Sequence, residues 1–147
     1  MIWLWPMLAS MLIGLALSQQ PAINGATSGV LDSAFAAAAF SLTISAFMVA
    51  TVFWLSGAPT RAVQFFELPW WSVLGGVIGA LFVTGGAMLV PITGAAVFFT
   101  CLIAGQLLGA VIADAVGAFG LEKQALSVWK LAGIALAFAG VVLVRWG

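Results

Sequence analysis

The side chains of this sequence that could take part in chemistry are few, and the most informative are amides inside apolar runs. Gln20 and Asn24 lie four residues apart, so on a helix they share one face, and Gln106 lies in a later run beside glycine. An amide carries two donor hydrogens and an acceptor oxygen, and its own helix cannot satisfy them all. In lipid such a group must face protein, water or a solute. These three residues are therefore candidates for a substrate-binding site or pathway.

The first two amides also have an ordinary structural explanation. Pro21 removes one backbone hydrogen bond, so the helix could simply end here and leave Gln20 and Asn24 in water. For Gln106, the nearby Gly105 and Gly109 suggest that the amide faces a neighbouring helix, which counts toward a functional role. At Gln20 and Asn24 the structural and functional explanations carry equal weight, whereas at Gln106 the functional one is slightly favoured.

Ionisable side chains are confined to the ends of the apolar runs. The acidic residues are Asp32, Glu67, Asp114 and Glu122. Asp114 lies about one turn inside the end of its run, which makes it a candidate functional carboxylate, although the cost of a charge is low near the interface and anchoring there is favoured. The middles of the first three runs hold no carboxylate, which argues against a proton-coupled cation exporter with its coupling group there.

The constellations that catalysis and metal binding require are missing from the sequence. It has no histidine, and its one cysteine, Cys101, lies in an apolar run. Neither a catalytic His pair nor a Cys/His metal cluster can form within one chain, and there is no Gly-rich phosphate loop. Four basic and four acidic residues provide no basic face for nucleic acid. We expect no enzyme activity, no cofactor, no metal and no nucleic-acid partner.

The elements that must position these residues are membrane-spanning helices. Of the 147 residues, 65% are hydrophobic and 5% are charged, whereas soluble domains carry roughly a quarter charged residues. A lipid bilayer is the solvent that such a composition fits. Breaks that contain Gly, Pro or charge divide the chain into apolar runs long enough to span a bilayer. The five expected spans are residues 2–23, 33–56, 70–90, 92–116 and 129–146.

The first run and the break at Pro91 are the least clear parts of this division. The first run lacks the basic segment of a secretory signal, so we expect it to remain as a helix. Hardly any polar residue separates the third and fourth runs at Pro91. One joined helix over residues 70–116 would be about 70 Å long, more than twice the ~30 Å core of a bilayer. Two helices are therefore expected on either side of Pro91.

The seven tryptophans support the spans, because Trp concentrates at membrane interfaces. Each lies near an end of an expected span: Trp3, Trp5, Trp54, Trp70, Trp71, Trp129 and Trp146. Five spans place the termini on opposite sides of the membrane. A cytoplasmic N-terminus puts Arg61, Lys123 and Lys130 inside and Arg145 outside, which weakly favours that orientation. Insertion in both orientations stays open.

Small residues provide faces on which helices can pack closely. The clearest set lies at four-residue steps in the fourth run and is joined by a pair in the third. These residues are Gly105, Gly109, Ala113 and Gly117, with Gly75 and Gly79. The fourth-run stripe could serve contacts within one chain or between chains. Five helices barely enclose a pathway, so we expect an oligomer. A transport pathway is commonly formed between two repeats of inverted topology.

The residues also resemble those of the YdcZ-type family of bacterial membrane proteins, in the drug/metabolite transporter superfamily. The resemblance covers most of the chain and rests on Pro69-Trp70-Trp71, Gly75-Gly76 with Gly79, Ala104-Gly105-Gln106, Asp114, Gly117, Gly133 and Ala139-Gly140. It implies a five-helix half-transporter of the inner membrane that works as an antiparallel pair, with itself or with a related subunit. Gln20, Asn24, Trp71 and Gln106 resemble the family's polar and aromatic positions. The basic residues that the family often has after the first-span Asn are missing here, and Thr43 replaces a family Gly.

We therefore expect an all-α integral membrane protein that moves a small molecule by alternating access across a dimer interface. The alternative is a non-transporting accessory or scaffold subunit. A channel is a third interpretation, but a channel needs a ring of pore-lining groups, and one five-helix unit offers few.

Overall fold

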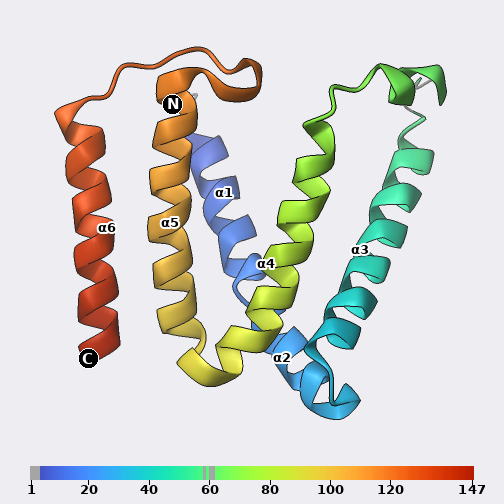
Figure 1. Ribbon diagram of the computed structural model, residues 1–147, viewed down its shortest axis with the longest axis horizontal. Coiled ribbons are helices and arrows are strands. Elements are labelled where there is room, and N and C mark those ends of the chain that lie inside the picture. Colours follow the sequence, from blue (N-terminus) through green and yellow to red (C-terminus); the bar gives the residue numbers. More distant parts are fainter. Residues whose placement is uncertain (1–3, 58, 60–61) are drawn as a thin grey trace. The chain divides into compact units, whose positions relative to one another are not determined.

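The computed structural model describes residues 4–57, 59 and 62–147, and for residues 62 and 63 the backbone alone. Trp3 and Arg61, on which the interface and orientation arguments partly depend, lie outside the described residues. Every regular element of the described chain is helical (Figure 1). The elements are α1 (Leu4–Leu17), α2 (Gln20–Leu31), α3 (Ala34–Ser56), η1 (Ala62–Glu67), α4 (Ser72–Thr93), α5 (Ala95–Val116), η2 (Ala118–Gly120) and α6 (Val128–Trp146).

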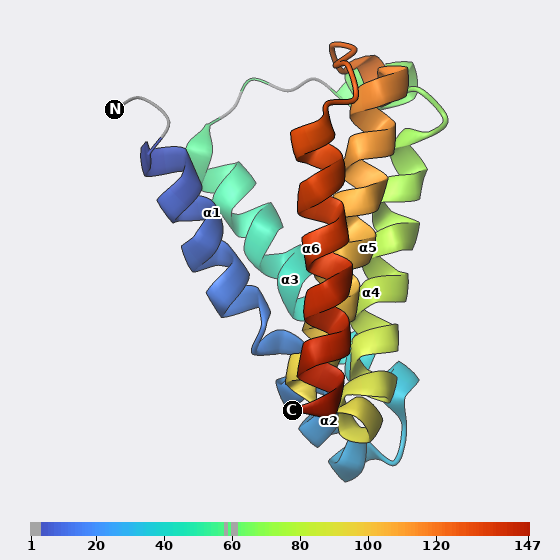
Figure 2. The same ribbon diagram turned by 90° about the vertical axis from the view of Figure 1, so that its left-hand side faces the viewer.

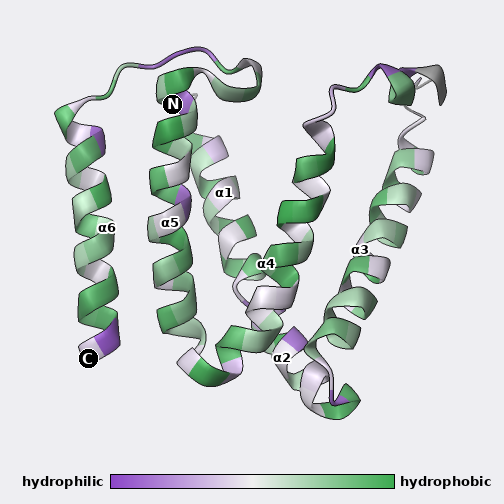
Figure 3. Cartoon of the chain, in the orientation of Figure 1, coloured by the Kyte–Doolittle hydropathy of each residue, from purple (hydrophilic) through white to green (hydrophobic). Residues whose placement is uncertain are grey.

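Four helices, α3 to α6, are long and apolar enough to cross a membrane, with 19 to 23 residues each. At 1.5 Å per residue these lengths match a hydrocarbon core of about 30 Å. Hydrophilic residues gather in the connecting segments and near helix ends (Figure 3). The prediction of an all-helical membrane protein is confirmed, and these four helices lie within three residues of the expected spans.

The structure corrects the prediction for the first span. The chain bends at Ser18 and Gln19, where helix is interrupted, and α2 then continues to Leu31 (Figure 2). Pro21 lies in the first turn of α2, where its missing N–H has no helical partner to lose, so the proline starts a helix rather than ending one. The polar stretch from Asn24 onward is therefore helical and not a loop. With 14 and 12 residues, neither α1 nor α2 alone has the length of a straight span.

The chain divides into two compact units, Met1–Ile92 and Thr93–Gly147. In the first unit, α2 packs against α3, and α1 contacts α2. Most of its buried residues are small, and the backbones of α2 and α3 lie close together. The buried residues are Pro21 and Asn24 on α2, Ala37 and Ala38 on α3, and Val83, Gly86, Ala87 and Val90 on α4.

In the second unit, α5 packs along α6. The buried residues of α5 are Ala104 and Val111, which are seven residues apart and so lie on one face. The helix begins after Gly94, whose φ of 78° and ψ of 154° belong to a region that essentially only glycine adopts. The expected pair of helices is confirmed, but the chain breaks at Gly94, whereas Pro91 lies inside the last turn of α4.

Candidate functional site

Asn24 lies in the core of the first unit. Its side chain is 4% exposed, and its Nδ2 has no hydrogen-bond partner among the residues that the structure describes. Pro21, three residues earlier on the same face of α2, is also buried. Gln20 opens α2 and is half-buried. Asn24 is therefore buried within α2 and does not lie at a hydrated helix end.

Gly25 allows α2 to approach α4 closely beside this amide. A Cβ atom on Gly25 would lie 3.1 Å from Cγ and 3.4 Å from Cδ of Pro91, and 3.8 Å from the carbonyl oxygen of Ala87. The first of these separations is tighter than ordinary van der Waals contact. Glycine at this position therefore brings the α4 backbone next to the turn of α2 that carries Asn24.

Pro91 leaves a backbone carbonyl at this crossing without its usual helical donor. Proline has no N–H, so it cannot donate the usual helical hydrogen bond to the carbonyl of Ala87, four residues earlier. Ala87 is 1% exposed. We call Asn24, Gly25, Ala87 and Pro91 the α2–α4 crossing. It places an amide donor and a backbone acceptor among apolar residues, which suits hydrogen bonding to a neutral group and offers nothing for acid–base chemistry.

The other predicted pathway residues lie apart from this crossing in the sequence. Trp71 is half-buried in the turn before α4, where its carbonyl oxygen accepts a hydrogen bond from the Leu74 N–H at 3.0 Å. On α4, Gly75 is exposed and Gly79 is half-buried. Gln106 is in the second unit, on α5. The structure therefore joins Gln20 and Asn24 on one helix and leaves Trp71 and Gln106 on other elements.

The small-residue stripe of α5 is not the face that packs on α6. Gly105, Gln106 and Gly109 are exposed, whereas Ala104 and Val111, on another side of the helix, are buried. Gly117 has a different role, because it ends α5 with a φ of 70° and its N–H bonds back into the last turn. Part of the predicted packing stripe is thus free within this unit.

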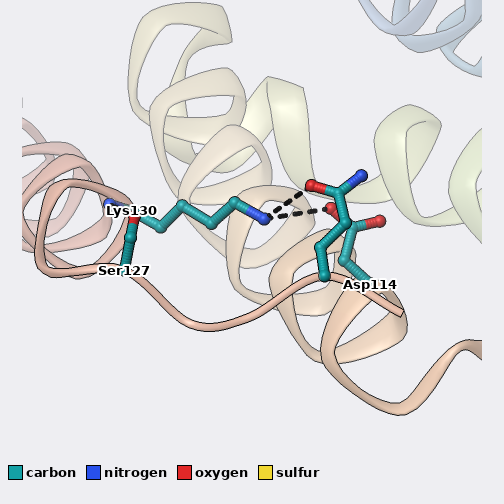
Figure 4. A network of polar contacts seen from close by, with 4 residues as sticks. Asp114, Ser127 and Lys130 are labelled. Atoms are coloured by element: carbon teal, nitrogen blue, oxygen red, sulfur yellow. Dashed lines mark hydrogen bonds and ion pairs between the residues drawn. The ribbon is translucent and has the colours of Figure 1, made fainter. Parts of the chain in front are cut away.

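Asp114 lies in a polar cluster at the end of α5 (Figure 4). Its Oδ2 is 3.6 Å from Nζ of Lys130, with the two side chains 32% and 30% exposed. The same Nζ donates a hydrogen bond of 2.9 Å to Oε1 of Gln124, whose backbone N–H donates one of 2.9 Å to the Asp114 carbonyl. Ser127 caps α6 by accepting from the Lys130 N–H at 3.2 Å. This cluster ties the loop between α5 and α6 together and supports the anchoring explanation for Asp114.

Sequence reasoning identified one of the four residues of the α2–α4 crossing and missed the other three. Asn24 was a candidate, but Gly25, Ala87 and Pro91 were not. Pro91 drew attention only as a helix boundary. The signal that could have found it is a proline inside an apolar span, since such a residue always leaves one helix carbonyl without its usual donor.

Apolar helices of spanning length, with one neutral amide buried in the described chain, define a multi-pass helical membrane protein. The family model described as "Putative inner membrane exporter, YdcZ" matches residues 5–143. The chain therefore belongs to this family of the drug/metabolite transporter superfamily. It is an inner membrane protein of an exporter family rather than of an enzyme family. No curated protein and no solved structure matched the chain.

Proposed function

We propose that this protein is one half of an exporter that moves a small molecule across the inner membrane by alternating access. The other half is a second copy or a related five-helix subunit, inserted in the opposite orientation. Membership of an exporter family supports the export activity.

The observation that carries the pairing is the exposed face of α5 formed by Gly105, Gln106 and Gly109. The α5 helix has the length and hydropathy of a membrane span, and Gln106 is close to its middle. An amide at that depth needs protein or a water-filled pathway beside it, because lipid offers no hydrogen bonds. Glycines on the same face allow another helix backbone to approach closely. A partner subunit on this face satisfies both requirements.

The opposite orientation of the partner follows from the N-terminal segment. The 14 residues of α1 and the 12 of α2 together extend about 40 Å, enough for one bent crossing in addition to those of α3 to α6. Five crossings place the termini on opposite sides. A pathway between two subunits with such topology is formed when one subunit is inverted relative to the other. Trp71, Gln20 and Asn24 then belong to the pathway-lining set together with Gln106.

Flux through purified protein in liposomes tests the transport activity. Vesicles loaded with unlabelled solute receive a trace of radiolabelled uridine, erythritol, tetraethylammonium or succinate outside, so that neutral, cationic and anionic solutes are compared. We expect saturable counterflow of at least one class, which protein-free vesicles lack. A scaffold or accessory subunit would give no saturable flux for any solute when both protein orientations are present. That result would overturn the proposed function.

A further inference from the structure

We propose that Asn24 and the backbone carbonyl of Ala87 form the hydrogen-bonding site of the exporter for an uncharged solute. The solute presents an acceptor oxygen to Nδ2 of Asn24 and a hydroxyl or N–H donor to the carbonyl of Ala87. This inference rests on the proposed function and narrows its substrate to neutral polar molecules.

The donor half of the site is the unpaired amide. Asn24 is more than nine-tenths buried, and within the described part of the chain its Nδ2 is the buried side-chain atom left without a hydrogen-bond partner. An unsatisfied buried donor is costly, and each such group in a protein needs an explanation. A packing role does not explain the amide, because an apolar residue of similar size would fill the same space without the free-energy cost of an unpaired donor. A ligand that accepts the hydrogen bond explains why an amide is here.

The acceptor half lies in the same helix crossing. The carbonyl oxygen of Ala87 is 3.8 Å from the position that a Cβ atom on Gly25 would take, and Gly25 directly follows Asn24. Pro91 withholds the N–H that a helix would normally give this oxygen. The carbonyl oxygen that Pro91 leaves without its usual helical donor therefore lies beside Gly25, the residue next to Asn24 in α2.

The absence of charge around the crossing sets the class of solute. The residues buried in the described part of the first unit are Pro21, Asn24, Ala37, Ala38, Val83, Gly86, Ala87 and Val90. None of them is ionisable, and an ion placed among them would have no counter-charge in a low-dielectric interior. A neutral solute with one acceptor and one donor can bond to Asn24 Nδ2 and to the Ala87 carbonyl, and it brings no uncompensated charge.

The helix is broken at both ends of α2, so α2 can move and open the site. Helix is interrupted before it at Ser18 and Gln19, and after it Asp32 takes a left-handed conformation with φ of 50° and ψ of 27°. Breaks at both ends let a helix of 12 residues tilt as one piece. Tilting α2 away from α4 at Gly25 would uncover Asn24 and the Ala87 carbonyl together, which is the change that alternating access requires.

The test is counterflow in liposomes, with uridine and erythritol compared against tetraethylammonium and succinate. The liposomes contain wild-type protein, Asn24→Leu, Pro91→Ala or Gln64→Leu. Asn24→Leu removes the donor, and Pro91→Ala supplies an N–H that can occupy the Ala87 carbonyl. Gln64→Leu is the matched control, because Gln64 is an exposed amide of η1 and lies outside both α2 and α4. We expect neutral-solute flux to fall at least tenfold in the first two variants and less than twofold in the control. The midpoint of thermal unfolding of Asn24→Leu without solute should equal or exceed that of the wild type.

The outcomes separate this inference from the proposed function. Saturable wild-type flux of tetraethylammonium or succinate without flux of either neutral solute would overturn the inference and leave the exporter intact. Neutral-solute flux that Asn24→Leu and Pro91→Ala both leave at the control level would also overturn it. No flux of any solute would overturn the proposed function, and the inference with it. If Asn24→Leu does not fold, the amide has a structural role and the inference fails, unless Pro91→Ala folds and loses neutral-solute flux.

Discussion

An amide buried without a partner, as at Asn24, is a cost that few soluble cores would carry. The energy of leaving such a donor unpaired is about 1–3 kcal/mol, a large part of the stability of a small domain. Its neighbour Gly25 serves the same crossing by removing bulk, so that Pro91 and Ala87 come close. Two adjacent residues of α2 therefore provide the polarity and the close approach of the α2–α4 crossing.

Alanine substitutions at the two glycines of α2 separate close packing from helix propensity. Gly25→Ala places a methyl group 3.1 Å from Cγ of Pro91, and because the proline ring is rigid, α4 must shift. We expect a loss of about 1–3 kcal/mol, the usual range for overpacking. Thermal unfolding of the purified protein, followed by circular dichroism, measures it.

Gly29→Ala is the matched control on the same helix. A Cβ atom at Gly29 would have no atom of the described chain within 4 Å, so the change should act only through helix propensity and stabilise by up to about 1 kcal/mol. Equal unfolding midpoints for the two variants would contradict the close contact between α2 and α4.

At the residue scale, the sequence allowed Asn24 to be selected as a candidate but could not identify what it meets. An amide in an apolar run is visible because its side chain differs from its neighbours. The Ala87 carbonyl is a backbone group that every residue has, and it lies far from Asn24 along the chain. Only the crossing of α2 and α4 brings this carbonyl beside Gly25, the residue next to Asn24.

At the scale of elements, hydropathy was enough to predict α3 to α6, because bilayer thickness fixes the length of a span. It did not predict the division between α1 and α2. Proline is compatible with a helix start as well as a helix end, and the Gly and Ser residues after Asn24, which suggested a loop, are tolerated in membrane helices. The composition of a short polar stretch does not decide between these outcomes.

The loop between α5 and α6 depends on Gly117, which the sequence suggested as a packing residue. Gly117→Ala would need a φ of +70° and would place its Cβ 2.8 Å from Cγ of Lys123 and 3.0 Å from the Leu121 carbonyl oxygen. We expect this variant to lose about 1–3 kcal/mol through backbone strain, and more through the contact with backbone. Denaturation of the purified protein by heat, read as the change in midpoint, checks this.

Gly120→Ala provides the comparison for that loop. Gly120 has a φ of +86°, but in the described structure no atom lies within 4 Å of its Cβ position. Only backbone strain should destabilise Gly120→Ala, so this variant should lose less stability than Gly117→Ala. The reverse order would show that the Asp114, Gln124 and Lys130 cluster does not hold the loop in the conformation described.

At the scale of the whole molecule, five crossings predict opposite sides for the two termini. A reporter fused after Gly147 measures this in intact cells. With a cytoplasmic N-terminus we expect signal outside the cytoplasm, or on both sides if the chain inserts in two orientations. Signal from the cytoplasm alone would contradict the orientation favoured by the basic residues.

The pairing of two inverted subunits has a geometric signature on α5. Gln106 is near the middle of Ala95–Val116, so it lies opposite itself when one helix is inverted. Phe99 and Ala113 lie seven residues to either side, on the same face. In an inverted pair, Phe99 faces Ala113 of the partner, whereas two copies of Phe99 are about 20 Å apart at 1.5 Å per residue.

Cysteine cross-linking in membranes, on a Cys101→Ala background, tests this arrangement most directly. We predict that Gln106→Cys cross-links to itself, and that Phe99→Cys cross-links to Ala113→Cys when the two variants are co-expressed with different tags. Neither of these last two variants should cross-link to itself. Cross-links at none of the positions would exclude pairing of identical copies through α5. Self-cross-linking of both Phe99→Cys and Ala113→Cys would mean parallel subunits and would contradict the inverted half-exporter.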